Sequence, residues 1–111
     1  EIILSGAVSA VDDGDVVAVR QMQKLAIWPN PANPGTHVEY QLVTDTRVVL
    51  RIMNVRGQLV RTLVDGWRPS GAQRAFWDGR DDSGRDAASG VYLAVAEWAT
   101  DRSVGRIVLV R

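Results

Sequence analysis

The stretch Thr36-His37-Val38-Glu39-Tyr40-Gln41-Leu42 decides the fold, because from His37 onward its side chains alternate between polar and apolar. Successive side chains of a β-strand point to opposite faces of the sheet. The segment therefore predicts a strand that turns Val38, Tyr40 and Leu42 into a core and its polar residues toward water.

The alternation continues in residues 47–54, where Val48, Leu50 and Ile52 share the face opposite two arginines. Further runs bounded by turn residues predict the remaining strands: residues 58–64, 72–77, 90–98 and 103–110. Turn residues recur every ~8–12 residues, a spacing typical of β-sandwiches and barrels. The sequence therefore predicts an all-β domain, whose last two runs pair as an antiparallel hairpin.

The connection after residues 58–64 is predicted to be a loop. Asp65-Gly66 and Pro69-Ser70-Gly71 are turn-forming sequences, so Trp67 is expected in a turn. The apolar pattern of residues 58–64 also suits a helical turn, but flanking glycines and β-branched residues favour a strand.

Length and composition restrict the class of protein. The chain has 111 residues, 13 acidic and 13 basic side chains and no cysteine. One domain is the default at this size, and a balanced charge gives no reason to expect a nucleic-acid partner. Disulfides and Cys-ligated zinc are excluded, and no apolar run approaches the ~20 residues of a transmembrane helix.

The first 23 residues are expected to lie outside the main domain. They form two apolar stretches, residues 2–11 and 16–19, joined by an acidic turn and compatible with a hairpin. We predict the tail of a preceding domain here, although a first strand of the sandwich is the alternative. The chain opens within an apolar run without the basic start of a signal peptide, as a fragment of a longer protein would. The main domain is predicted to span residues 24–111.

A proline-rich segment precedes the first clear strand. Pro29, Pro31 and Pro34 remove three backbone donors within six residues. Proline is confined to the edges of sheets, so the segment from Leu25 to Thr36 is expected to be a rigid extended lead-in rather than part of a sheet.

The motif Leu25-Ala26-Ile27-Trp28-Pro29-Asn30-Pro31 resembles that of the C-terminal sorting domains of type IX secretion cargo. It is also similar to the immunoglobulin-like domain of flagellar hook-capping proteins. Later segments agree with these families in order and spacing: residues 55–63, 77–85, 88–92 and 107–111. The residues that carry the resemblance are Pro29, Asn30, Pro31, Gly57, Trp77, Asp78, Gly79, Asp82, Gly84, Gly90, Tyr92 and Arg111.

The resemblance implies an immunoglobulin-like antiparallel β-sandwich of about seven strands. It implies a non-catalytic C-terminal module of a larger exported bacterial protein, which serves as a secretion-sorting or cell-surface attachment signal. Such modules pass through the periplasm and are recognised by export proteins at the outer membrane, so an extracellular or cell-surface location is expected. The final strand ends in a basic residue in these families, so Arg111 is expected to be a natural C-terminus.

One loop invites a metal hypothesis. Asp78, Asp81, Asp82 and Asp86 place four carboxylates within nine residues, and carboxylates are ligands for calcium. The spacing does not match an EF-hand, because Arg80 occupies a ligand position and no glutamate closes the run. Calcium binding and a self-capping Asx turn both remain open, and no other cofactor is expected.

Single side chains give weaker signals. His37 is the only histidine and lies on the polar face of its strand, where an ordinary surface residue is expected. Among the four tryptophans, Trp77 is expected in the core, whereas Trp67 and Trp98 are the candidates for a sugar-binding platform.

Two alternatives to sorting follow. In the first alternative, the chain is a carbohydrate-binding or adhesive accessory domain that binds a surface glycan. Otherwise it is a structural subunit, whose terminal strand or first 23 residues pair with another β-chain at a sheet edge.

Overall fold

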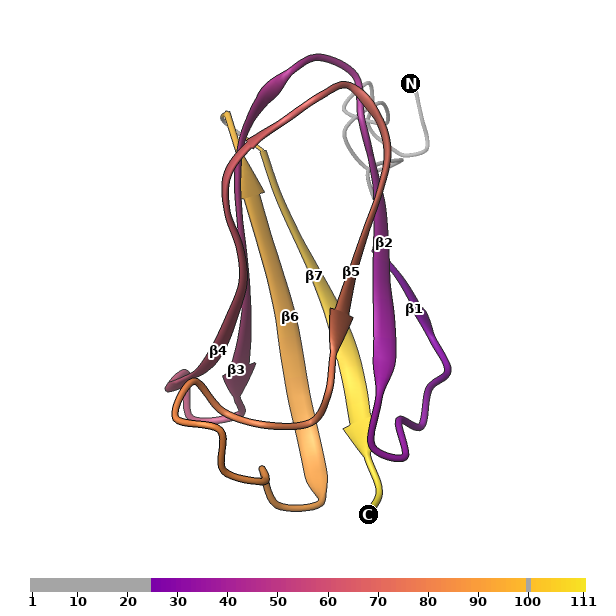
Figure 1. The fold of residues 1–111 in the computed structure, drawn as a ribbon, viewed down its shortest axis with the longest axis vertical. Helices are drawn as coiled ribbons and strands as arrows, with labels where there is room; N and C mark the ends of the chain where they lie inside the picture. The colour runs from indigo at the N-terminus through magenta and orange to yellow at the C-terminus, as the bar shows by residue number, and fades with distance from the viewer. Residues whose placement is uncertain (1–24, 100) are drawn as a thin grey trace, which may run out of the picture.

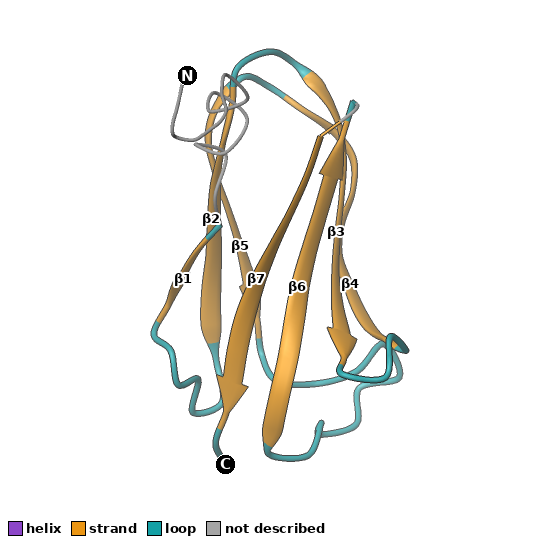
Figure 2. Cartoon of the chain, turned by 180° about the vertical axis from the view of Figure 1, so that it is seen from behind, coloured by secondary structure: helices purple, strands orange, loops and turns teal. Residues whose placement is uncertain are grey.

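The computed structural model describes residues 25–99 and 101–111, which form two antiparallel sheets packed face to face (Figures 1 and 2). The strands in chain order are β1 (Ala26–Trp28), β2 (Thr36–Leu42), β3 (Thr46–Asn54), β4 (Leu59–Arg68), β5 (Gly71–Trp77), β6 (Gly90–Trp98) and β7 (Asp101–Leu109). One sheet has the order β1-β2-β5 and the other β4-β3-β6-β7. The prediction of an all-β, immunoglobulin-like sandwich of about seven strands is confirmed. No helix long and apolar enough to cross a membrane occurs in the described part of the chain.

The core forms where the alternating faces of β2 and β3 meet. The side chains predicted to point inward are 0–4% exposed: Val38, Tyr40, Leu42, Val48, Leu50 and Ile52. Trp77 is completely buried, as predicted, and its ring meets the ring of Tyr92 edge-on at a centroid distance of 5.2 Å. The Tyr92 hydroxyl donates to the Ala88 carbonyl oxygen at 2.6 Å, an interaction that fixes the start of β6.

The predicted turn at Asp65-Gly66 is wrong, because β4 continues through it to Arg68. Gly66 pairs with Val48 and Asp65 with Val49 on β3, and the Asp65 carboxylate accepts a hydrogen bond from Arg47. The register of β4 against β3 also shifts twice, which breaks simple alternation and accounts for the helix-like apolar pattern of residues 58–64. Pairing with a neighbouring strand thus overrides the local turn preference.

The proline segment is also more ordered than predicted. Residues Ala26–Trp28, just before the first proline, form the short edge strand β1 and pair with β2. Ala32, between two prolines, makes a parallel bridge with Leu109 of β7. The neighbouring prolines do not prevent either pairing, because β1 is an edge strand that ends before Pro29 and the bridge uses the backbone of Ala32.

The last two strands form the predicted antiparallel hairpin, paired from Gly90 and Leu109 to Trp98 and Asp101. β7 begins two residues earlier than the predicted strand of residues 103–110. The expectations for residues 1–23 lie outside the described residues.

Candidate functional site

All the residues that carry the family motif gather at one end of the sandwich, the lower end in Figure 1. Three connections and the chain end meet there: residues 29–35 between β1 and β2, residues 55–58 between β3 and β4, residues 78–89 between β5 and β6, and residues 110–111. Of the motif residues within strands, Trp77 ends β5 and Gly90 begins β6, with Tyr92 two residues on. We call this region the motif end.

The proline segment closes the free edge of β7. The Asn30 side chain donates its amide N–H to the Arg106 carbonyl oxygen at 2.8 Å, and its Oδ1 accepts from the Val108 N–H at 2.9 Å. Ala32 continues the ladder through its backbone, donating to Val108 O at 2.7 Å and accepting from Val110 N at 2.8 Å. An asparagine amide thus takes the place of a neighbouring strand's peptide group along residues 106–110.

The connection of residues 78–89, here called the acidic loop, closes the edge of β4, at the opposite side of the same sheet. The Asp82 backbone N–H donates to Val60 O at 2.9 Å, and the Asp82 carboxylate accepts from the Thr62 N–H at 3.1 Å. Arg61 adds a hydrogen bond to the Asp78 carboxylate at 3.0 Å. Both edges of the four-stranded sheet are therefore covered near the motif end, a common protection against edge-to-edge pairing.

The same loop is organised by turns around its aspartates. Asp81 Oδ1 accepts hydrogen bonds from the Ser83 hydroxyl at 2.7 Å, the Ser83 N–H at 2.9 Å and the Arg85 N–H at 3.0 Å. The Ser83 hydroxyl, followed by the Arg85 N–H, holds the pKa of Asp81 below its ordinary value because these donors favour the charged carboxylate. Gly84 completes this turn with φ near 87°. The geometry is that of the predicted Asx turn.

The calcium hypothesis finds no support in this arrangement. Asp78 and Asp82 face Arg61, Asp81 binds its own turn, and Asp86 lies 3.4 Å from Arg80. Within residues 25–99 and 101–111, no group of three or more His, Cys, Asp or Glu side chains is placed to hold a metal ion. The loop carboxylates are committed to arginines and backbone N–H groups.

Calcium is accordingly expected to leave the thermal stability of the chain unchanged. A ligand that binds only the folded state at 100 times its Kd would add ~2.7 kcal/mol to the free energy of unfolding. Differential scanning fluorimetry with millimolar CaCl₂ measures this, with MgCl₂ at equal ionic strength as the control. A rise in Tm specific to calcium would contradict the assignment of these carboxylates.

Arg111 joins the end of the chain to the acidic loop. Its guanidinium donates to the carbonyl oxygens of Ala87, at 2.6 Å, and Gly79, and lies 3.6 Å from Asp86. Its backbone N–H donates to the Ser89 hydroxyl at 3.0 Å. Glycine is favoured at position 79 because its φ is 81° and because a Cβ there would lie 2.9 Å from the Cβ of Pro34, as well as 2.9 Å from the Arg111 guanidinium. The basic residue is thus part of the folded surface rather than a free tail.

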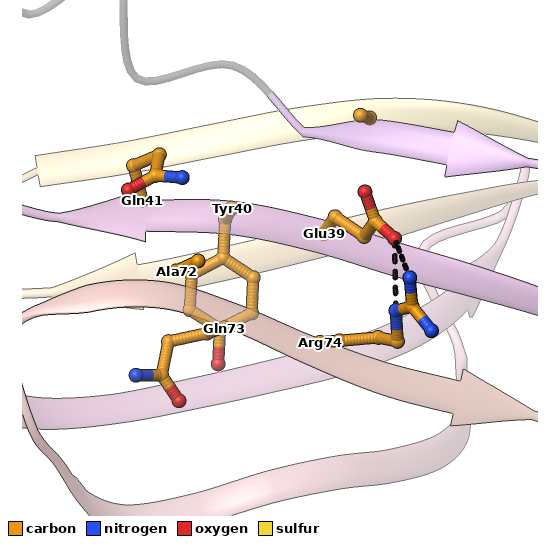
Figure 3. Close-up of a pocket in the computed structure, with 7 residues that line it drawn as sticks. Glu39, Tyr40, Gln41, Ala72, Gln73 and Arg74 are labelled. Atoms are coloured by element: carbon orange, nitrogen blue, oxygen red, sulfur yellow. Dashed lines mark hydrogen bonds and ion pairs between the residues drawn. The ribbon is translucent and has the colours of Figure 1, made fainter.

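The outer face of the three-stranded sheet carries a second cluster. Trp28, His37 and Phe76 are register partners on β1, β2 and β5, and Trp28 and Phe76 are 67% and 54% exposed. Beside them Glu39 and Arg74 form an ion pair across β2 and β5, with N–O distances of 2.8 Å (Figure 3).

A hollow of about 330 Å³ opens next to the ion pair (Figure 3). It is lined by Ala26, Glu39, Tyr40, Gln41, Ala72, Gln73 and Arg74. The Tyr40 ring turns away from the ion pair and stacks on Trp98 in the core, and burial raises the pKa of the Tyr40 hydroxyl above its ordinary value. The outer face therefore places aromatic, ionic and amide groups next to one another.

The sugar platform predicted on Trp67 and Trp98 is wrong. Trp98 is only 5% exposed and packs on Tyr40 in the core, whereas Trp67, on β4 of the same four-stranded sheet, is 69% exposed. His37 does lie on the outward face of its strand, but between two aromatic rings. The cluster was missed because Phe76 lies far along the chain from Trp28, and only the strand order brings them together.

Comparison with known proteins identifies a family that matches the chain. The FlgD Ig-like domain family matches residues 34–102, more than half of the chain. No curated protein matches the chain significantly.

Three solved structures share the fold. Dimeric latent PorU from Porphyromonas gingivalis is 19% identical, with a TM-score of 0.59 over 78% of this chain and 9% of that one. FlgD from P. aeruginosa is 21% identical, with a TM-score of 0.54 over 67% of this chain and 57% of that one. PorZ, an essential bacterial surface component of the type-IX secretion system of P. gingivalis, is 20% identical, with a TM-score of 0.57 over 78% of this chain and 11% of that one.

The chain spans less than two thirds of each of these structures, and at these identities the likeness concerns the fold. Neighbours of both kinds, flagellar and type IX, agree with the resemblance seen in the sequence. By its match over residues 34–102, the chain belongs to the FlgD Ig-like domain family.

Proposed function

We propose that the chain is a non-catalytic, C-terminal module of a larger exported bacterial protein, and that export proteins recognise its motif end as a sorting or surface-attachment signal. The supporting observation is that the motif residues, which come from four parts of the sequence, meet at one end of the sandwich. A single partner protein could contact all of these residues at once, because they lie at the same end.

Under this proposal, the export proteins recognise a folded surface rather than the last residues alone. β7 is bonded to Asn30 and Ala32 at its edge, and Arg111 is bonded to the acidic loop. A partner reaching the last residues therefore meets the loops that hold them. The likeness to PorZ, a surface component of type IX secretion, supports this route of export and a cell-surface or extracellular destination.

Pairing of the terminal strand with another β-chain is less well supported. Strand addition uses free backbone N–H and C=O groups at a sheet edge. Asn30 and Ala32 already bond Arg106, Val108 and Val110. Any such pairing would be confined to the first half of β7.

The experiment places the 111-residue chain behind a reporter protein with a signal peptide, in a host that has type IX secretion. Export of the reporter to the surface or medium is expected, and retention in the periplasm would contradict the proposal. A reporter without the chain is the baseline.

Matched charge reversals locate the recognised surface. Arg85 is exposed in the acidic loop, and Arg102 is exposed at the far end of the sandwich. Arg85→Glu is expected to reduce export while leaving Tm unchanged, whereas Arg102→Glu is expected to export normally. Equal export of both variants would mean that the motif end is not the recognised surface.

A further inference from the structure

Three aromatic rings form a continuous row across the outer face of the three-stranded sheet. Trp28 is the register partner of His37, and His37 is the register partner of Phe76. Neighbouring strands lie ~4.8 Å apart, so the row extends about 10 Å across three strands. The Trp28 and His37 rings are nearly parallel, with an interplanar angle of 17° and a centroid distance of 6.2 Å.

The row is held in place by its surroundings. Phe76 tilts against His37 at a centroid distance of 5.0 Å and lies over the backbone of Gly35. A Cβ at Gly35 would come within 2.5 Å of the Phe76 ring, so only glycine leaves the ring where it is. Two large aromatic residues, Trp28 and Phe76, are therefore held by neighbouring groups while more than half exposed to solvent.

Polar groups suited to hydroxyls lie beside the row. Glu39 and Arg74 occupy the outward positions next to His37 on β2 and Phe76 on β5. Their ion pair leaves unused acceptor and donor sites. Gln41 adds an amide at the following position, beside the hollow of about 330 Å³. The positive and negative charges cancel within this face.

This combination matches the chemistry of an uncharged sugar chain. The C–H faces of a pyranose ring carry slight positive charge and pack on the negative faces of aromatic rings. Its hydroxyls both donate and accept hydrogen bonds, which suits a carboxylate, a guanidinium and an amide. A row about 10 Å long offers stacking positions for consecutive sugar units.

A protein partner fits this face less well. A stable protein interface buries ~800 Å² on each partner. Three aromatic side chains bury about 150–250 Å² each when fully covered, and here they are partly covered already. The row offers much less than such an interface, and the ion pair and amide flank it directly.

We propose that the outer face of the β1-β2-β5 sheet binds a neutral polysaccharide, with Trp28, His37 and Phe76 as the stacking platform and Glu39, Arg74 and Gln41 as hydrogen-bonding partners. The row lies beside the motif end, which includes Gly35, but the binding of a polysaccharide by this face does not depend on the function proposed above.

Affinity electrophoresis of the 111-residue chain tests this, in native gels containing hydroxyethyl cellulose, xyloglucan, galactomannan or laminarin. At least one polysaccharide is expected to retard the chain. Trp28→Ala and Phe76→Ala are each expected to weaken binding about tenfold or more, because each removes one stacking contact. Gly35→Ala keeps every aromatic residue but displaces the Phe76 ring, and is expected to weaken binding as well.

Trp67→Ala is the matched control, since Trp67 is 69% exposed on the other sheet while Trp28 is 67% exposed. This variant is expected to bind as the native chain does. Equal Tm values for all four variants would show that folding is retained. Absence of retardation by every polysaccharide would overturn the proposal, and so would a loss in Trp67→Ala equal to that in Trp28→Ala.

Discussion

Replacing Trp77 by alanine is expected to lower the free energy of unfolding by about 3–5 kcal/mol. Trp77 is completely buried, and its indole N–H donates to the Arg80 carbonyl oxygen at 2.9 Å. The variant loses the largest fully buried side chain, its contact with Tyr92 and a hydrogen bond that anchors the acidic loop. Because whole domains are stable by only ~5–15 kcal/mol, much of the total would be lost.

Urea denaturation followed by circular dichroism measures the change. Trp67→Ala is the control, because Trp67 is 69% exposed and its removal is expected to cost no more than about 0.5 kcal/mol. Similar losses in both variants would contradict the assignment of Trp77 to the core.

The second large effect is expected for Asn30→Leu. The leucine side chain is similar in size but has no polar atoms, so the Arg106 carbonyl and the Val108 N–H both lose their partner. The expected cost is about 1–3 kcal/mol, the range for a backbone group left unpaired. Water can reach the site and moderates the loss, since both hydrogen bonds lie near the surface.

The same substitution also frees part of the β7 edge. A strand edge with unpaired backbone groups pairs readily with another chain. Asn30→Leu is therefore expected to form dimers or larger species in size-exclusion chromatography with light scattering. Asn33→Ala alters an exposed residue of the same loop and is expected to remain as the native chain does. Unchanged stability and mass in Asn30→Leu would show that Asn30 does not close this edge.

Strands with one buried face could be predicted from the sequence alone. After their first residues, Thr36 and Thr46, the buried positions of β2 and β3 are apolar and alternate with less buried ones, so the alternation directly reports the geometry of the sandwich. The ends of β2 and β6 agree with the predicted bounds.

Interactions between distant segments could not be predicted. Asp65-Gly66 is a turn sequence that pairing with β3 keeps extended. Asn30 contacts Arg106, 76 residues later, and nothing local to either residue indicates this pairing. The pairing of Asp78 and Asp82 with Arg61 could not be predicted either, because Arg61 lies outside the loop, 17 residues before Asp78.

The row of Trp28, His37 and Phe76 could not be predicted for the same reason, because it joins distant segments. In the sequence, Trp28 is part of the proline motif, and Phe76 directly precedes Trp77 at the end of the predicted strand of residues 72–77. Successive side chains of β5 point to opposite faces, so Phe76 is exposed while Trp77 is buried. The order of the strands then brings Phe76 beside His37 and Trp28. A sequence pattern shows which residues share a face of one strand, whereas a binding surface depends on which strands are neighbours.

Amide hydrogen exchange at the edges of the four-stranded sheet tests the central claim most directly. If the proline segment and the acidic loop close these edges, the N–H groups of Val108 and Thr62 exchange slowly, as those of interior strands do. Asn30→Leu then accelerates exchange at Val108 and leaves Thr62 protected. Exchange of Val108 and Thr62 in the native chain at the rate of an unprotected amide would contradict the account.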